Sequence, residues 1–134
     1  IAAVLLNLLV ALGLTVLAAK YAFGPVPADY HAAILATSGQ PIGPHQLLVF
    51  GAINKVFAGC FLALAIALTM LTVFGVWQEM YWAKIGTAAI AVVAGVPSSF
   101  AAYTVEQTSG VRTPWRSGVL LSVLVLIAFV LSVA

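Results

Sequence analysis

The sequence predicts an all-α transmembrane four-helix bundle with a short surface helix in the first loop, and three observations lead to it. Hydrophobic residues make up 64% of the 134 residues and charged residues only 6%, whereas a soluble domain carries roughly 25% charged residues. Four segments are each apolar over about the 20 residues that a helix needs to cross a bilayer. None of them alternates as the strands of a membrane barrel do, and an open sheet would leave its edge amides unpaired in lipid.

The four predicted spans form a single transmembrane domain, 1–134. They cover about residues 1–23, 47–74, 85–103 and 118–134. The connecting segments are short and rich in proline, glycine and charge, as turns and loops are. With four spans, the first and third connections share one face of the membrane. The turn "GVWQEMYWAK" lies on the other, where its Trp77, Tyr81 and Trp82 are typical of an interfacial aromatic belt.

The first connection is too long for a tight turn and is apolar in its middle. Pro27 and Asp29 can start a helix at "YHAAILA", and Ser38 and Gly39 can end it. A helix of this kind lies on the membrane surface or caps the bundle.

Two neighbouring residues of this surface helix, Tyr30 and His31, are expected to fasten it over the bundle. His31 and His45 could meet beneath it, and two histidines on one face permit a metal or haem site. No third ligand and no ligand-spaced motif supports such a site, so we expect no metal and no cofactor.

Small residues at helical spacing predict the seams where the spans pack, because they let helix backbones approach closely. In the second span, Gly51, Gly59 and Ala63 share one stripe with Lys55 at intervals of four residues. The third span contains Pro97 followed by two serines, which predicts a kink whose freed carbonyl the hydroxyls help to satisfy. The residues expected to pack between helices are Gly51, Gly59, Ala63, Asn7, Gly95 and Ser99.

Lys55 is the most unusual residue of the predicted spans. It lies about eight residues into the second span, roughly 12 Å deep at 1.5 Å per residue. A charge at that depth is expensive unless it is paired, so we expect its ammonium to point into the bundle and to pair with Glu106 or Asp29. A structural ion pair and a site that binds or moves something both remain open. The candidate polar cluster is Lys55, Asn54, Glu106, Asp29, Tyr30, His31 and His45.

The sequence carries no enzyme signature. It has no nucleophile beside a base, no carboxylate pair within a span and no glycine-rich phosphate loop. A formal charge of +2, scattered along the chain, does not indicate a nucleic-acid partner. We therefore expect no enzymatic activity.

Two functions fit these residues. The first is a non-catalytic accessory or scaffold subunit of a larger inner-membrane complex, whose partners are the lipid bilayer and other subunits or further copies of itself. The alternative is a small oligomeric transporter or channel for a small solute or anion. Its path would be lined by Lys55, Asn54 and the serines at the predicted kink, with symmetric copies supplying the polar groups that one chain lacks.

Four short motifs make the chain similar to a group of uncharacterised small bacterial four-helix membrane proteins. They are Tyr30-His31, a basic residue early in the second span followed by Gly59, "YWAK" before the third span and "TSGVRTPW" before the fourth. The resemblance covers most of the chain and implies a multi-pass protein of the bacterial inner membrane, without an activity. Members of the group carry arginine where Lys55 stands, and a more basic turn between the second and third spans.

The orientation in the membrane is open on sequence grounds. The positive-inside rule places the face with Lys20, Arg112 and Arg116 in the cytoplasm. The resemblance and the long first loop place that face in the periplasm, with cytoplasmic termini, and we favour this second orientation.

Overall fold

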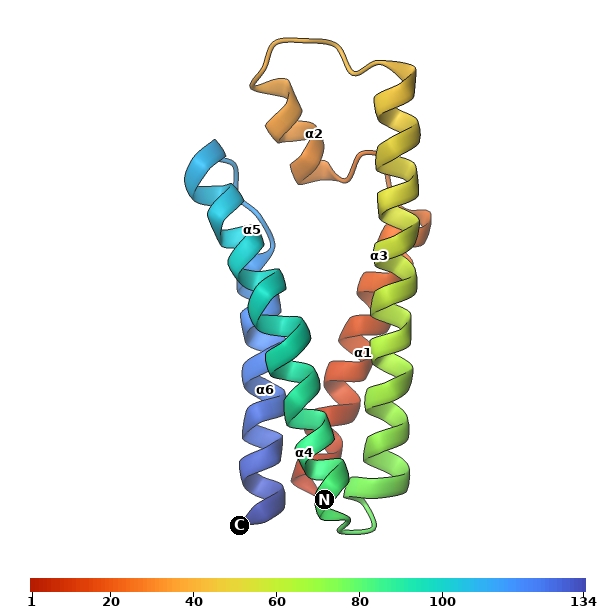
Figure 1. Ribbon diagram of the computed structural model, residues 1–134, viewed down its shortest axis with the longest axis vertical. Coiled ribbons are helices and arrows are strands. Elements are labelled where there is room, and N and C mark those ends of the chain that lie inside the picture. Colours follow the sequence, from red (N-terminus) through yellow and green to blue (C-terminus); the bar gives the residue numbers. More distant parts are fainter.

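The chain folds into an antiparallel bundle of helices. A computed structural model describes all residues, 1–134, and contains no strand. Figure 1 shows both termini at one end of the bundle, with α2 and the α5–α6 connection at the other. The elements are α1 (Ala2–Phe23), α2 (Asp29–Ala36), α3 (Pro44–Leu71), the π-helical turn η1 (Thr72–Val76), α4 (Tyr81–Ile90), the π-helical turn η2 (Ala91–Gly95), α5 (Val96–Ser109) and α6 (Trp115–Val133).

Four of the resulting helices are long and apolar enough to cross a membrane. They run over Ala2–Phe23, Pro44–Val76, Tyr81–Ser109 and Trp115–Val133, with both π-helical turns included. The predicted all-α class, the four long apolar helices and the short helix in the first loop are therefore confirmed.

The third long helix runs further than the sequence pattern predicted, to Ser109 rather than residue 103. Polar residues near its end do not stop it, because the hydroxyls of Thr104, Thr108 and Ser109 each donate to the carbonyl four residues earlier in the helix. It ends where Gly110 takes the left-handed conformation with φ 69°, a conformation that glycine adopts at little cost and that commonly ends helices.

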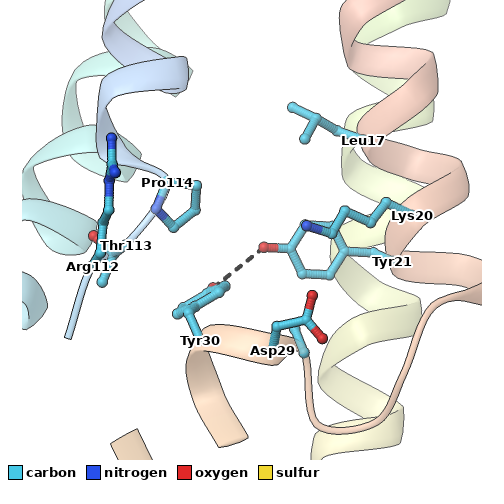
Figure 2. Close-up of a pocket in the computed structure, with 9 residues that line it drawn as sticks. Leu17, Lys20, Tyr21, Asp29, Tyr30, Arg112, Thr113 and Pro114 are labelled. Carbon is cyan, nitrogen blue, oxygen red and sulfur yellow. Dashed lines mark hydrogen bonds between the residues drawn. The ribbon is translucent and has the colours of Figure 1, made fainter. Parts of the chain in front are cut away.

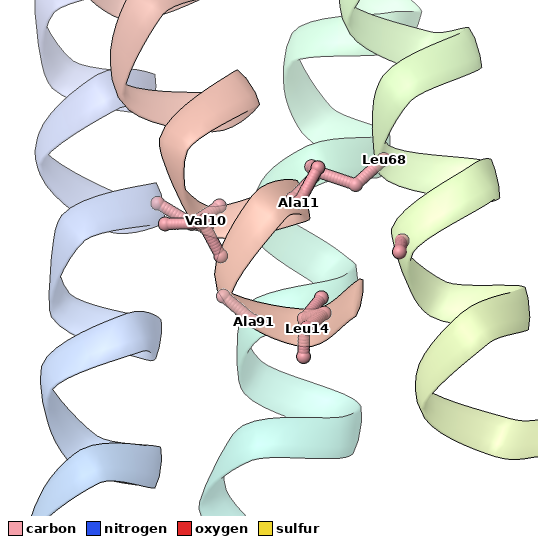
Figure 3. Close-up of a cluster of buried hydrophobic side chains, with 7 residues drawn as sticks. Val10, Ala11, Leu14, Leu68 and Ala91 are labelled. Atoms are coloured by element: carbon pink, nitrogen blue, oxygen red, sulfur yellow. The ribbon is translucent and has the colours of Figure 1, made fainter. Parts of the chain in front are cut away.

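The core lies where α1 crosses the other long helices. Val10, Ala11 and Leu14 of α1 pack against Leu68 of α3 and Ala91 of η2 (Figure 3). Leu68 is completely buried. Small residues in this cluster let the backbones approach closely, as in helix packing within membranes. The complete cluster is Val10, Ala11, Leu14, Ala65, Leu68, Ala91 and Val125.

The bundle is built from two helix pairs. α1 packs along α3, α5 packs along α6, and α1 also contacts α6. In Figure 1 the two pairs diverge toward the end that carries α2, and α2 lies between their upper ends. The pairs are closest at the opposite end, where the chain termini and α4 lie.

Gly75, in η1, permits the tight packing of the turn between α3 and α4. The Gly75 carbonyl accepts a hydrogen bond from the Met80 N–H at 2.9 Å. A Cβ atom at this position would overlap the Cβ of Ala83, which is itself completely buried. Only a residue without a side chain fits here, and the sequence pattern alone did not indicate this.

The predicted kink at Pro97 has a π-helical turn on its N-terminal side. η2 ends at Gly95, two residues before the proline. The Ser98 hydroxyl donates to the Ala94 carbonyl, four residues before it, at 2.6 Å. The carbonyl that Pro97 leaves without its helical donor is that of Val93, so the expectation that a serine satisfies it stays a prediction. π-Helical turns commonly relieve such interruptions of the hydrogen-bond ladder.

Candidate functional site

The structure does not gather the predicted polar cluster into one site. Asn54 is buried on the inner side of α3, whereas Lys55 is exposed on the outer side. Glu106 lies at the corner between α5 and α6. Asp29, Tyr30 and His31 belong to α2, and His45 is exposed in the first turn of α3.

The expectation that Lys55 points into the bundle is wrong. Lys55, Gly59 and Ala63 are all exposed, and a Cβ atom on Gly59 would meet nothing within 4 Å. The buried residues of α3 include Asn54 and Ala58, each one position earlier. Successive residues on a helix are about 100° apart. Because Asn54 and Ala58 face the bundle, the stripe of Lys55 and Gly59 faces outward.

The expected ion pair of Lys55 is also wrong. The chain has two ion pairs, between Lys84 and Glu79 and between Arg116 and Glu106. Lys55 belongs to neither of them.

Three other predicted packing residues do lie in seams. Asn7 is buried in α1, although its Oδ1 atom finds no hydrogen-bond partner. A Cβ atom on Gly95 would lie 3.1 Å from Ser122 Cβ and still closer to its hydroxyl. The Ser99 hydroxyl lies only 2.6 Å from the position that a Cβ on Gly118 would take. The seam between η2–α5 and α6 therefore depends on small residues on both sides.

Gly51, the remaining predicted packing residue, contacts a loop instead of another long helix. A Cβ atom built on it would lie 3.8 Å from Val26 Cγ1, which is an ordinary van der Waals distance. This position does not require glycine for packing.

Glu106 organises the corner between α5 and α6. It accepts hydrogen bonds from the Thr113 N–H at 2.8 Å and from the Arg116 guanidinium at 3.0 and 3.3 Å. The Thr113 hydroxyl donates to the Ala102 carbonyl at 2.7 Å. The Arg116 guanidinium also lies over the Trp115 ring, 4.7 Å from its centroid. These contacts give Glu106 a structural role at this corner.

Lys84 has a structural role that the sequence pattern did not indicate. Its side chain is buried at the start of α4, and its ammonium donates to Glu79 and to the Ser132 carbonyl of α6. The hydrogen bond from Lys84 lowers the pKa of the exposed Glu79 carboxyl. Ala83 and Thr87, both completely buried, share this side of α4.

The surface helix α2 is fastened to both α1 and α3. The Tyr30 and Tyr21 hydroxyls are 3.3 Å apart and hydrogen bonded. The His31 ring lies 5.7 Å from the Phe50 ring, centroid to centroid. The Asn54 side-chain amide donates to the Pro25 carbonyl at 3.3 Å. The expected fastening by Tyr30 and His31 is confirmed by these contacts.

Burial shifts the pKa values of Tyr30 and His31 in the first turn of α2. It raises the pKa of Tyr30 well above the ordinary value for a phenol, and the hydrogen bond with Tyr21 adds to this shift. Burial lowers the pKa of His31. Both side chains are therefore neutral near pH 7, and the Tyr30 hydroxyl keeps its proton.

A pocket of about 200 Å³ lies where α1 ends, α2 begins and α5 connects to α6. We call it the boundary pocket. Figure 2 shows Lys20, Tyr21 and Asp29 on one side, Arg112 on the opposite side and Tyr30 between them. None of its three charged residues belongs to an ion pair. The lining is Leu17, Lys20, Tyr21, Ala28, Asp29, Tyr30, Arg112, Thr113 and Pro114.

Comparison with known proteins supplies no assignment. The chain matches no protein-family model, no curated protein and no solved structure. No three histidine, cysteine, aspartate or glutamate side chains come together in an arrangement that could hold a metal ion. The two features of the molecule that can indicate a function are the exposed face of α3 and the boundary pocket.

Proposed function

We propose that the protein is a multi-pass integral membrane protein that serves as a non-catalytic subunit of a larger membrane assembly. The observation that carries the proposal is the outward face of α3, which is exposed, continues beyond the end of α1 and combines apolar residues with an unpaired lysine.

The exposed surfaces of the long helices support a bilayer environment. Of their most apolar windows, only 39% of residues are buried in Ala2–Phe23 and only 11% in Trp115–Val133. Large side chains such as Leu12 and Val93 are 61% and 73% exposed. Water disfavours contiguous apolar surface of this extent, whereas lipid tails accept it.

Two belts of residues define the limits of the proposed hydrocarbon layer. Trp77, Tyr81 and Trp82 are exposed at the end that holds the chain termini, as interfacial aromatic residues are. About 33 Å of helix at 1.5 Å per residue separates Trp77 from Lys55, close to the ≈30 Å thickness of the hydrocarbon core. Lys55 would therefore lie near the opposite boundary, where its ammonium can reach polar groups.

Beyond Lys55, α3 continues to Pro44 for about 16 Å. Its outward residues there stay apolar, since Leu48 is 74% exposed and Val49 56%. Leu48, Lys55, Gly59 and Ile66 recur at intervals of seven, four and seven residues, which places them on one helix face. We call this face the outer stripe.

The outer stripe has the composition of a contact between helices of different chains. Exposed apolar side chains outside the hydrocarbon layer are favoured when a partner covers them, and Gly59 would let a partner helix approach closely. Lys55 has no counter-charge within this chain, which has three acidic residues in all. Two are in ion pairs and the third, Asp29, lies in the boundary pocket. The counter-charge would therefore come from another molecule.

The alternative function is an oligomeric transporter or channel, in which the outer stripes of identical copies would face one another. Within one chain the core cluster is entirely apolar. The Asn54 amide is bonded to the Pro25 carbonyl and the Ser98 hydroxyl to the Ala94 carbonyl. A polar path would thus have to arise between copies, with Lys55 as its charged group.

A substitution at Gly59 tests the contact directly. We expect Gly59→Leu to abolish co-purification of the partner from native membranes, while the thermal midpoint of the isolated protein stays unchanged because Gly59 faces open space. Ala89→Leu, an equally small-to-large change at an exposed position of α4, is the matched control and should retain the partner.

Three results of this experiment are informative. A distinct second protein that is lost in Gly59→Leu supports the subunit role, and a homo-oligomer that is lost supports the transporter or channel. Retention of all associated protein in Gly59→Leu would contradict both, because the outer stripe would then not be a contact.

A further inference from the structure

We propose that the boundary pocket binds a phosphate ester that also carries an ammonium group, as in the phosphoethanolamine headgroup of a phospholipid. The proposed subunit role does not use this pocket, so the inference adds a binding site to it. It shares with that role only the placement of the helices in a bilayer.

The cations of the pocket provide the site for the phosphate. Lys20 lies in the last turn of α1 and Arg112 in the connection before α6, and they line the pocket from opposite sides (Figure 2). Neither side chain has a carboxylate partner within the chain. Lysine and arginine form short, charge-assisted hydrogen bonds with phosphate oxygens.

The tyrosine pair provides a neutral donor. Tyr21 and Tyr30 have two hydroxyl hydrogens between them, and their mutual hydrogen bond uses one. The second hydrogen is free to be donated to a phosphate oxygen. Burial keeps the Tyr30 hydroxyl protonated, so the pair does not add negative charge to the pocket.

Asp29 selects for an ammonium group on the same ligand. Its carboxylate lines the pocket without an ion pair. A purely anionic headgroup would meet repulsion from this carboxylate, whereas an ammonium group would pair with it. Two cations and one anion in the lining thus complement a ligand with one phosphate and one ammonium.

The size and position of the pocket agree with a headgroup. A volume of about 200 Å³ is smaller than the ≈300–1,000 Å³ of sites for drug-sized ligands. Lys20 lies three residues before α1 ends at Phe23, at the level proposed above for the membrane boundary. Lipid headgroups occupy that level, and a free phosphoethanolamine molecule could reach it from water.

Lipid titration of the purified, delipidated full-length protein in detergent, followed by native mass spectrometry, tests the proposal. We expect short-chain phosphatidylethanolamine to bind about tenfold more tightly than phosphatidylglycerol with the same chains. Lys20→Gln and Arg112→Gln should each weaken phosphatidylethanolamine binding about tenfold, the effect of losing one charged hydrogen bond. Asp29→Asn should reduce the difference in affinity between phosphatidylethanolamine and phosphatidylglycerol.

His45→Gln is the control, because it changes an exposed polar residue of α3 outside the pocket, and it should bind both lipids as the unmodified protein does. Competition by soluble phosphoethanolamine would show that the headgroup alone is recognised. Lipid binding that resists this competition but is lost in Lys20→Gln would show that the acyl chains contribute too.

Two results would overturn the proposal. One is phosphatidylglycerol binding at least as tightly as phosphatidylethanolamine. The other is equal lipid binding by Lys20→Gln, Arg112→Gln and the control His45→Gln, with thermal midpoints that show all three to be folded. The purified protein is tested without any partner subunit. Either result would therefore overturn the lipid site without bearing on the proposed partner contact through the outer stripe.

Discussion

Gly75→Ala is expected to destabilise the bundle by about 1–3 kcal/mol, the usual range for overpacking, although it adds only one methyl group. The new methyl would overlap the Cβ of Ala83, and the Cα of Ala83 would lie 3.6 Å from it. These atoms cannot rotate away, so η1 and the start of α4 would have to separate. Reversible unfolding in SDS–detergent mixtures measures the change.

A control and a rescue make this prediction specific. Gly59→Ala makes the same chemical change where nothing lies within 4 Å, and should be neutral or slightly stabilising because alanine favours helix more than glycine does. The double variant Gly75→Ala/Ala83→Gly removes the opposing methyl and should recover most of the loss. If Gly75→Ala is as stable as Gly59→Ala, the close approach of η1 and α4 is wrong.

Leu68→Ala is expected to cost about 2 kcal/mol, near the low end of the range for truncation of a buried leucine. Leu68 is completely buried in the core cluster against α1 (Figure 3). In a bilayer, the unfolded helices keep their apolar side chains in lipid, so the transfer contribution is small and the loss of packing dominates.

The matched control for this truncation is Leu120→Ala on α6, where leucine is 59% exposed. We expect its effect to stay within about 0.5 kcal/mol, as for other exposed substitutions. Equal losses in the two variants, measured by the same unfolding assay, would show that Leu68 does not lie in a packed core.

The long helices were predictable because length and hydropathy determine them locally. The start of α2 was also indicated locally, since a proline and an acidic residue are typical of the beginning of a helix. The π-helical turns were not predictable, because they form in response to packing against other helices and have no characteristic amino-acid composition. Gly75 illustrates this, since its position requires glycine only because Ala83 of the following helix packs against it.

The direction of Lys55 illustrates the limit of reasoning from small-residue stripes. α3 carries two such stripes, one through Gly51 and Gly59 and one through Asn54 and Ala58, and both fit a helix seam. Only the position of α1 decides between them, and it packs against the Asn54 side, where Ala65 and Leu68 complete the buried face.

The boundary pocket was predicted only in part. Asp29 was a candidate residue as a counter-charge for Lys55, and Tyr30 as a residue that fastens the surface helix. Lys20 and Arg112 line the same pocket, but they are separated by most of the chain, and the sequence placed them only on the same face of the membrane. Which residues of that face line one pocket depends on how the end of α1 packs beside the α5–α6 connection, which no local pattern encodes.

The most direct test of the central claim, that these helices cross a bilayer, is cysteine labelling in sealed proteoliposomes with a membrane-impermeant maleimide. Cys60, the single cysteine, is exposed on α3 between Lys55 and Trp77. We expect it to resist labelling until the protein is denatured. In a Cys60→Ser background, Gln40→Cys in the first loop and Gln78→Cys in the turn after η1 should be labelled from opposite sides of the membrane. Rapid labelling of Cys60 in intact vesicles, or labelling of both introduced cysteines from the same side, would contradict the transmembrane arrangement.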